Sequence, residues 1–255
     1  MLEDLYHGAL ADAAIRQETQ DFAAVEKAAL GSSPALNVAE VLRPDAKVKI
    51  LAEVKRASPS RGDLAQIANP AELARIYADN GASAISVLTE ERKFKGSLKD
   101  LAAVRAAVDI PILRKDFIAN EYQLLEARAA GADIALLIVA GLESKLLRRL
   151  FDFTSQLGMM PFVETHSADE LRIAADLGGR MIGVNARDLS SFETDRNLFE
   201  KLVDLFPAGA IKVAESAVRT AEDVLHYRQA GADVVLVGEA LVKGNPAEML
   251  LSFLA

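Results

Sequence analysis

The sequence predicts an α/β protein with the architecture of a (β/α)8 TIM barrel, preceded by an N-terminal helical extension. Eight short apolar segments alternate with eight amphipathic segments through residues 48–254. The chain has 255 residues, 51% of them hydrophobic, which matches the length and the core of a typical barrel. A doubly wound open sheet is the weaker alternative, because it usually stops at five or six strands. We therefore expect one barrel domain over residues 1–255, with residues 1–46 as its extension.

The extension carries helical rather than strand spacing. Its apolar residues recur every three or four positions over residues 2–28, until Gly31-Ser32-Ser33-Pro34 interrupts the pattern. A short helix is expected over residues 37–42, before Arg43-Pro44-Asp45. This section is too short to hold a core of its own, so we expect it to pack on the barrel.

The elements of the barrel follow in strict alternation. The predicted strands lie at residues 48–55, 83–89, 110–115, 133–139, 160–164, 181–185, 211–215 and 233–237. The predicted helices lie at residues 70–80, 97–108, 119–130, 142–157, 167–177, 196–205, 219–230 and 245–254. Asn69 before Pro70 and Ser167 ahead of Glu170 have the side chains of helix caps.

Four glycines repeat at intervals of about two βα units each. Gly81, Gly131, Gly178 and Gly231 each stand between a predicted helix and an apolar strand. Glycine suits a helix C-terminus that needs a left-handed residue, so the repeat supports the alternation.

The first strand and the loop after it, residues 48–62, combine an apolar face with a charged end. Alternation places Ile50, Ala52 and Val54 on one face, and Glu53 and Lys55 on the other. The following Ser58-Pro59-Ser60 with Gly62 opposes regular structure and offers hydroxyl and backbone N–H groups to an anion. An ordinary surface ion pair is the alternative interpretation of this stretch.

Polar side chains also stand at the ends of later strands, where barrel enzymes carry their catalytic groups. They are Lys115 after the third strand, Glu164 after the fifth, Asn185 and Arg187 after the sixth, and Glu215 and Ser216 after the seventh. Buried together, they form either a structural ion-pair ring or a site whose pKa values are tuned apart for acid–base chemistry. We expect His166 and His226 on the surface, and Lys93 and Lys95 in a mobile loop outside the chemistry.

A phosphate site is expected where the loops after the seventh and eighth strands meet, as in many barrels. These loops contain Ser216-Ala217 and Gly238-Glu239.

The composition of the chain argues against several classes of binding partner. The net charge of −8 argues against nucleic acid and anionic membranes, so a local basic cluster must hold any anionic ligand. The chain has no cysteine and only three, widely separated histidines, which makes a metal site unexpected. The N-terminus lacks a signal-peptide pattern, and the longest apolar run, residues 134–141, is too short to cross a bilayer. We expect a cytoplasmic protein.

At this point the motifs resemble those of the indole-3-glycerol phosphate synthase family. The matching segments, in order, are AEVKRASPSRG (52–62), SVLTEERKFKGS (86–97), ILRKDFI (112–118), ALLIVAGL (135–142), PFVETHS (161–167), IGVNARDL (182–189), KVAES (212–216) and VLVGEAL (235–241). The resemblance covers most of the chain and includes the helical extension.

The resemblance implies a decarboxylating ring closure of 1-(2-carboxyphenylamino)-1-deoxyribulose 5-phosphate to indole-3-glycerol phosphate. It implies that Lys115 is the general acid on the ketose oxygen and that Glu164 assists the later dehydration. Glu53 would position a lysine, and Lys55 would bind the anionic substrate and share the acid role. Asn185 would orient the reacting hydroxyl or amine, and the resemblance implies no metal or organic cofactor.

The remaining implied contacts bind the substrate. Phe117 and Leu136 would enclose the aromatic ring, and the pocket and its phosphate end would include Ser58, Arg187, Glu215, Ser216, Ala217, Gly238 and Glu239. The family usually has glycine where this chain has Ala217; at positive φ, alanine costs roughly 1 kcal/mol.

Three other functions are weighed against this one. Phosphoribosylanthranilate isomerase, a sister barrel, would use a cysteine base, which this chain lacks. A Schiff-base aldolase could use Lys115 as its nucleophile. A non-catalytic barrel that binds a phosphate ligand is the third. We expect a monomer that acts on a small sugar phosphate.

Overall fold

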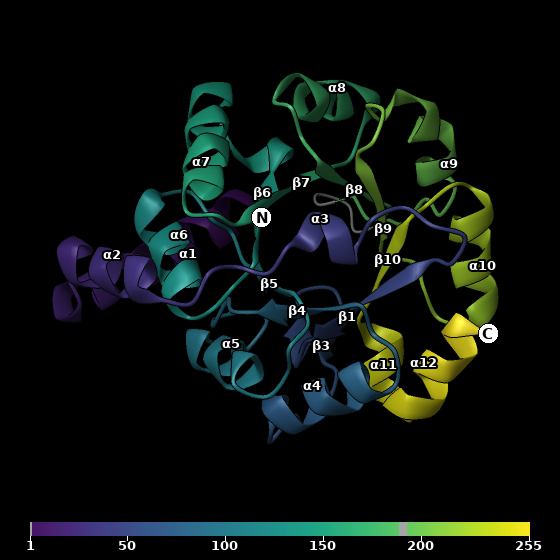
Figure 1. Cartoon of the computed structure of the whole chain (residues 1–255), viewed down its shortest axis with the longest axis horizontal. Helices are drawn as coiled ribbons and strands as arrows, with labels where there is room; N and C mark the ends of the chain where they lie inside the picture. The colour runs from purple at the N-terminus through teal and green to yellow at the C-terminus, as the bar shows by residue number, and fades with distance from the viewer. Residues whose placement is uncertain (1, 189–192) are drawn as a thin grey trace.

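The computed structural model describes residues 2–188 and 193–255, and within them eight parallel strands close into a barrel (Figure 1). Around the barrel the order is β1-β10-β9-β8-β7-β6-β5-β4, and pairing of β1 with both β10 and β4 completes the closure. The strands are β1 (Lys49–Val54), β4 (Ala84–Leu88), β5 (Ile112–Lys115), β6 (Ile134–Ile138), β7 (Met160–Thr165), β8 (Met181–Asn185), β9 (Ile211–Glu215) and β10 (Val234–Val237). The predicted fold class is confirmed.

Helices surround the strands in the view of Figure 1. They are α4 (Pro70–Asp79), α5 (Leu98–Arg105), α6 (Glu121–Ala129), α7 (Ser144–Gln156), α8 (Ala168–Asp176), α9 (Leu198–Leu202), α10 (Ala221–Gln229), α11 (Glu239–Lys243) and α12 (Pro246–Leu254), with 3-10 turns η1 (Val139–Gly141) and η2 (Val203–Leu205). Asn69 and Ser167 cap α4 and α8 as predicted, each accepting a backbone N–H. Among the described residues, no helix is long and apolar enough to span a membrane.

The core has two layers that follow the alternation along each strand. Outward residues such as Ile50, Ala52 and Val54 pack under the helices. Inward residues such as Leu51 and Phe162 fill the barrel interior. Because successive side chains of a strand point to opposite faces, inward and outward residues alternate along each strand. The same alternation continues to the carboxyl end of each strand, so it decides which of the last side chains point into the barrel.

Glycine conformation agrees with the predicted repeat. Gly81, Gly131, Gly178 and Gly231 all have positive φ, between 81° and 97°. Each lies just after the last turn of a helix, where a side chain would be strained.

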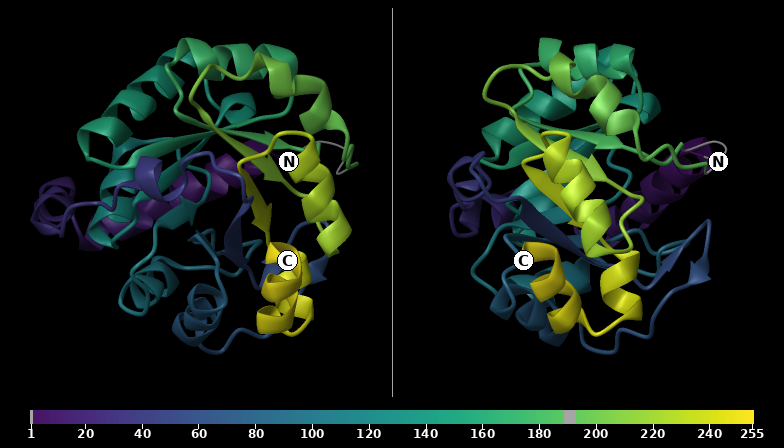
Figure 2. Two further views of the ribbon diagram at one scale, coloured as in Figure 1. Left: turned by 45° about the vertical axis from the view of Figure 1, so that its right-hand side comes forward. Right: turned by 90° about the vertical axis from the view of Figure 1, so that its right-hand side faces the viewer.

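The N-terminal extension forms α1 (Leu2–Thr19), α2 (Phe22–Gly31) and α3 (Val38–Val41), close to the predicted segments. Val38 and Leu42 belong to the cluster inside the barrel, whereas Leu2 and Leu5 line a cavity at the mouth. The extension therefore runs along the barrel from one end to the other, as the right-hand view of Figure 2 shows.

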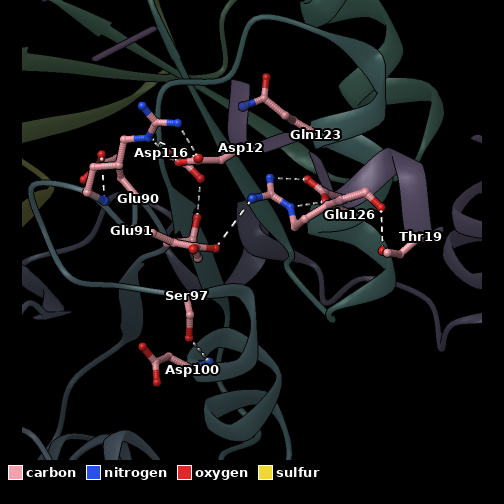
Figure 3. A network of polar contacts seen from close by, with 12 residues as sticks. Asp12, Thr19, Glu90, Glu91, Ser97, Asp100, Asp116, Gln123 and Glu126 are labelled. Atoms are coloured by element: carbon pink, nitrogen blue, oxygen red, sulfur yellow. Dashed lines mark hydrogen bonds and ion pairs between the residues drawn. The ribbon is translucent and has the colours of Figure 1, made fainter. Parts of the chain in front are cut away.

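A network of charged side chains fastens α1 to the barrel (Figure 3). Arg16 Nε lies 2.5 Å from Glu126 Oε1 of α6, and Arg92 Nη2 lies 2.7 Å from Asp12 Oδ1 of α1. Since Arg92 belongs to the segment after β4 and Glu126 to α6, the extension is tied to two neighbouring βα units.

One local prediction was wrong. The stretch after β1, expected to be irregular, forms the small antiparallel pair β2 (Ala57–Ser58) and β3 (Gly62–Asp63). Gly62 has a φ of +64°, and Arg61 N donates to Ser58 O, so the glycine makes the reversal possible. The pairing holds Ser58 at the rim of the barrel.

Candidate active site

A cavity of about 640 Å³ opens at the carboxyl ends of the strands. Its lining includes every residue that the sequence predicted for the site: Glu53, Lys55, Ser58, Lys115, Phe117, Leu136, Glu164, Asn185, Arg187, Glu215, Ser216, Ala217, Gly238 and Glu239. These residues come from β1, β5, β6, β7, β8, β9 and β10 and the segments after them. The structure thus brings together groups that lie up to about 190 positions apart.

Lys115 is the centre of the charged part of the cavity. Its Nζ lies 3.1 Å from Glu164 Oε2 and 2.8 Å from Glu215 Oε2, so one ammonium joins the ends of β5, β7 and β9. Both carboxylates are almost fully buried, whereas 16% of the Lys115 side chain is exposed to the cavity. The lysine is therefore the member of this cluster that a ligand reaches first.

Interactions among these charged groups shift their pKa values in different directions. Burial by itself lowers the pKa of Lys115, but the negative charges of Glu164 and Glu215 outweigh it and raise the pKa well above its usual range. Burial and the neighbouring Glu164 charge raise the pKa of Glu215. Burial opposes ionisation of Glu164 as well, yet Lys115, His166 and Asn185 hold its pKa far below the ordinary value. The site at rest thus contains an ammonium beside the ionised Glu164, whereas Glu215 gives up its proton less readily than an isolated carboxyl group does.

Asn185 connects this cluster to the loops after β8 and β9. Its Nδ2 donates to Glu164 Oε1 at 3.0 Å. Its Oδ1 accepts from Ser216 Oγ at 2.7 Å and from the backbone N–H of Arg187 at 3.0 Å. Three partners fix the amide, so Asn185 presents a defined orientation to Glu164.

Glu53 and Lys55 form a second ion pair at the end of β1, two strands away from β5 in the barrel. A side chain at Gly238 would overlap Glu53 Oε2 and approach Lys55 Nζ to 3.0 Å. Gly238 therefore gives this pair its space, in addition to its place beside the predicted phosphate position.

The loop after β9 is strained at the predicted phosphate end. Ser216 has a φ of +69° and Ala217 a φ of +59°, both in the left-handed region. Alanine occupies this conformation at a cost that glycine avoids, roughly 1 kcal/mol. Ala217 thus takes the positive φ at which alanine is less stable than the glycine that the family usually has here.

The apolar end of the cavity extends beyond Phe117 and Leu136. Leu2 and Leu5 of α1 and Phe94 after β4 also line it. The Phe94 ring centroid lies 6.0 Å from that of Phe117. The positions of Leu2 and Leu5 could not be predicted, because an apolar stripe on a helix predicts burial without saying where.

Other polar residues were missed or misplaced. Arg61, Arg196 and Arg219 line the cavity near its opening. His166, expected on the surface, keeps only 10% of its side chain exposed, with Nε2 3.3 Å from Glu164 Oε1. The sequence does place His166 two positions after Glu164, and alternation puts residues at this interval on the same face of a strand. This spacing could have predicted that His166 lies beside Glu164. His226 is likewise half-buried, on α10, rather than exposed.

Comparisons with known proteins agree with this geometry. The family model described as indole-3-glycerol phosphate synthase matches residues 2–252. This chain belongs to that family. The protein of that name from Leifsonia xyli subsp. xyli is 59% identical over 253 residues, covering 99% of this chain and 97% of the relative. The one from Rhodococcus opacus is 53% identical over 247 residues, covering 96% and 91%. The activity expected from the motifs, a carboxy-lyase of tryptophan biosynthesis, is confirmed at the level of the family.

Solved structures of low identity share the fold. The N-acetylmannosamine-6-phosphate 2-epimerase from Clostridium perfringens has a TM-score of 0.63 at 15% identity, covering 84% of this chain and 95% of the other. The 3-hexulose-6-phosphate synthase from Salmonella typhimurium has a TM-score of 0.63 at 15% identity, covering 81% and 96%. At this identity the likeness concerns the barrel alone.

Proposed function

We propose that Lys115 and Glu164 are the acid and the base with which this member of the indole-3-glycerol phosphate synthase family closes the indole ring. The substrate is 1-(2-carboxyphenylamino)-1-deoxyribulose 5-phosphate, and the products are indole-3-glycerol phosphate, carbon dioxide and water. The observation that supports this most strongly is the Lys115 ammonium, held between two buried carboxylates yet open to the cavity.

In the first step, the aromatic carbon that bears the carboxylate attacks the ketose carbon. The carbonyl π electrons move to oxygen, and Lys115 supplies the proton that turns this oxygen into a hydroxyl. Loss of carbon dioxide returns its bonding pair to the ring and restores aromaticity. Because Glu164 and Glu215 keep Lys115 protonated at rest, the lysine enters the reaction in the form that an acid requires.

In the second step, the new hydroxyl leaves as water. An acid protonates the leaving oxygen, and a base removes a proton from the neighbouring carbon to complete the indole double bond. Glu164 is ionised and fixed by Asn185, which suits it to be this base. In these steps the side chains of the protein only donate and accept protons, so the proposed reaction needs neither a metal nor an organic cofactor.

We expect the aromatic ring and the phosphate of the substrate to bind at different ends of the cavity. We place the aromatic ring between Phe117 and Leu136, and the phosphate near Ser58, the loop at Ser216 and Ala217, and the glycine at 238. Among the cations that line the cavity, we expect Lys55 and Arg187 to bind the anionic groups of the substrate. A chain of net charge −8 thereby binds an anionic substrate through local cations.

The direct test is an absorbance assay for indole formation with the purified chain and the carboxyphenylamino sugar phosphate. We expect turnover with carbon dioxide released in equal amount. Binding without turnover would favour the non-catalytic phosphate-binding barrel. Borohydride trapping of a keto substrate on Lys115 would favour the aldolase, but the raised pKa of Lys115 opposes this, because a nucleophilic lysine must lose its proton.

We also propose that residues 1–255 fold as one domain, with residues 1–46 as an integral part, and that the enzyme is a cytoplasmic monomer that binds no nucleic acid. The contacts of α1 with the segment after β4 and with α6 support the first point. The excess of acidic residues supports the last. Sedimentation of the purified chain tests the oligomeric state.

A further inference from the structure

His166 lies directly behind Glu164 and touches it on the side away from Lys115. Its Nε2 is 3.3 Å from Glu164 Oε1, whereas the nearest Lys115 contact is with Oε2. The two oxygens of one carboxylate therefore face two different cations. His166 does not line the main cavity, so it is placed to act on Glu164 rather than on the substrate.

Glu170 holds the imidazole from its other edge. His166 Nδ1 is 3.3 Å from Glu170 Oε2, and the same oxygen accepts the backbone N–H of His166 at 2.9 Å. Glu170 lies in the first turn of α8, and its own backbone N–H is bound by Ser167 Oγ at 3.2 Å. A carboxylate on each side of the ring favours the imidazolium, because both ring nitrogens are then donors.

Other titratable groups surround this pair from several elements. Around Glu164 and His166 stand Lys115 of β5, Glu215 of β9, Tyr6 of α1, Glu170 of α8, Glu53 of β1 acting through Lys115, and Asp188, Glu193 and Asp195 across a second cavity of about 320 Å³. Most of these groups are acidic, so the neighbourhood favours a positive charge on the ring. Burial by itself lowers the pKa of His166, but Glu164 and Glu170 raise it to about 10.

We propose that His166 is a positioning residue whose imidazolium keeps Glu164 ionised after Lys115 has given up its proton. This inference rests on the proposed roles of Lys115 and Glu164. When Lys115 protonates the ketose oxygen, it becomes neutral, and Glu164 loses one of its two cations. A buried carboxylate without a counter-charge takes up a proton and is no longer a base. With His166 behind it, Glu164 keeps a counter-charge until the dehydration step.

Single-turnover measurements of indole formation across pH test this in His166→Gln and His166→Asn. The amides keep a polar group but carry no charge, so the pKa of Glu164 rises in both variants. Since the base is the form above this pKa, the rate falls at acidic pH and recovers as pH increases. We expect the acid limb of the dehydration rate to move up by about one pH unit or more, a tenfold loss on its acidic side, with KM within threefold.

Glu170→Gln gives the opposite shift through the same ring. Without the Glu170 charge the pKa of His166 falls, so the imidazolium is lost at a lower pH and the alkaline limb moves inward. His7→Gln, on the exposed face of α1, is the matched control and leaves both limbs in place. A uniform loss at all pH values in the His166 variants would show a structural role only and overturn the proposal.

Two further readouts separate this proposal from the proposed function. Glu164→Gln that turns over normally would contradict the role of Glu164 itself, whereas an inactive Glu164→Gln beside unshifted His166 variants would contradict the inference alone. Side-chain nitrogen NMR of the three histidines, assigned through the variants, reports the protonation state directly. We expect the imidazolium at the pH of maximal turnover, and a neutral ring there would overturn the proposal.

Discussion

Arg114 and Lys115 are consecutive residues of β5 with opposite surroundings. Arg114 points outward and is fully buried, with hydrogen bonds to Thr89 Oγ1 at 3.0 Å, Asp116 Oδ2 at 2.8 Å and Gln123 O at 2.5 Å. Lys115 points into the mouth, where it meets two carboxylates and the cavity. One strand thus supplies a sealed cation and an accessible cation, one residue apart.

The surroundings of Arg114 and Lys115 differ in how many polar atoms of the neighbouring carboxylates form hydrogen bonds. Asp116 also accepts from Thr89 Oγ1 and from the Phe117 backbone, so the Arg114 network has few polar atoms left over. In the mouth, Glu215 Oε1 is buried and has no hydrogen-bond partner among residues 2–188 and 193–255. Buried polar atoms are normally paired, so an unpaired one beside a cavity indicates a place for a ligand or a proton transfer.

Lys115→Met should lower kcat by about three orders of magnitude or more while the chain stays folded. The change removes the proton donor, and positioned proton transfer contributes about 10²–10⁴-fold. Steady-state assays and circular dichroism measure the two quantities. Lys99→Met, on the exposed face of α5, is the control with near-native kcat. A Lys115 variant of near-native rate would remove this lysine from the chemistry.

Arg114→Met should lower the stability of the fold strongly and change kcat little, the opposite of Lys115→Met. It leaves the buried carboxylates of Asp116 and Glu126 with one cation fewer, which costs about 3–5 kcal/mol of unfolding free energy. At temperatures where the variant is folded, we expect kcat within about tenfold of the native value. Urea denaturation measures the stability. Unchanged stability would show that the outward network is dispensable.

Glu164→Gln should lower kcat by about 10²-fold and leave KM within a few-fold, because it removes a base but preserves the shape of the site. Steady-state kinetics separates the two constants. Glu222→Gln, exposed on α10, provides the same chemical change outside the mouth. Equal losses in binding and turnover would assign Glu164 to substrate binding.

Inorganic phosphate at millimolar concentration should raise KM several-fold without changing kcat. The expected site lies at the loops after β9 and β10, where phosphate and substrate compete for the same groups. Initial rates at several phosphate concentrations measure the effect. Indifference to phosphate would argue against this position of the phosphate.

Ala217→Gly should raise the unfolding free energy by about 1 kcal/mol, because glycine takes the φ of +59° without strain. Ala102→Gly, in the exposed middle of α5, makes the same substitution at helical φ and should lower stability by about 1 kcal/mol. Opposite signs in urea denaturation confirm the strain at residue 217, and the same sign would contradict it.

The barrel and the convergence of the charged strand ends Glu53, Lys115, Glu164 and Glu215 on one cavity followed from the sequence because both depend on alternation. A strand that ends in an inward Lys115 must have an inward Leu113, and the same register holds for Glu164 and Glu215 on their strands. Once the strands close into a ring, these side chains have one place to meet. The helix caps and the glycine positions are equally local, which is why they too could be predicted.

Contacts between distant segments could not be predicted in this way. The position of Leu2 and Leu5 at the mouth depends on how α1 crosses the barrel, which Arg16 and Arg92 fix through partners far along the chain. The burial of His166 depends on α8 presenting Glu170 to the ring. The β2–β3 pair depends on a register between two short, polar segments whose sequences favour turns.

In the proposed mechanism Lys115, rather than Lys55, delivers the proton to the ketose oxygen. The most direct measurement is a crystal structure with the unreactive substrate analogue in which the ketone is reduced to an alcohol. We predict the alcohol oxygen within about 2.6–3.2 Å of Lys115 Nζ, with the ring beside Phe117. An oxygen bound by Lys55, with Lys115 still paired only to Glu164 and Glu215, would contradict the claim.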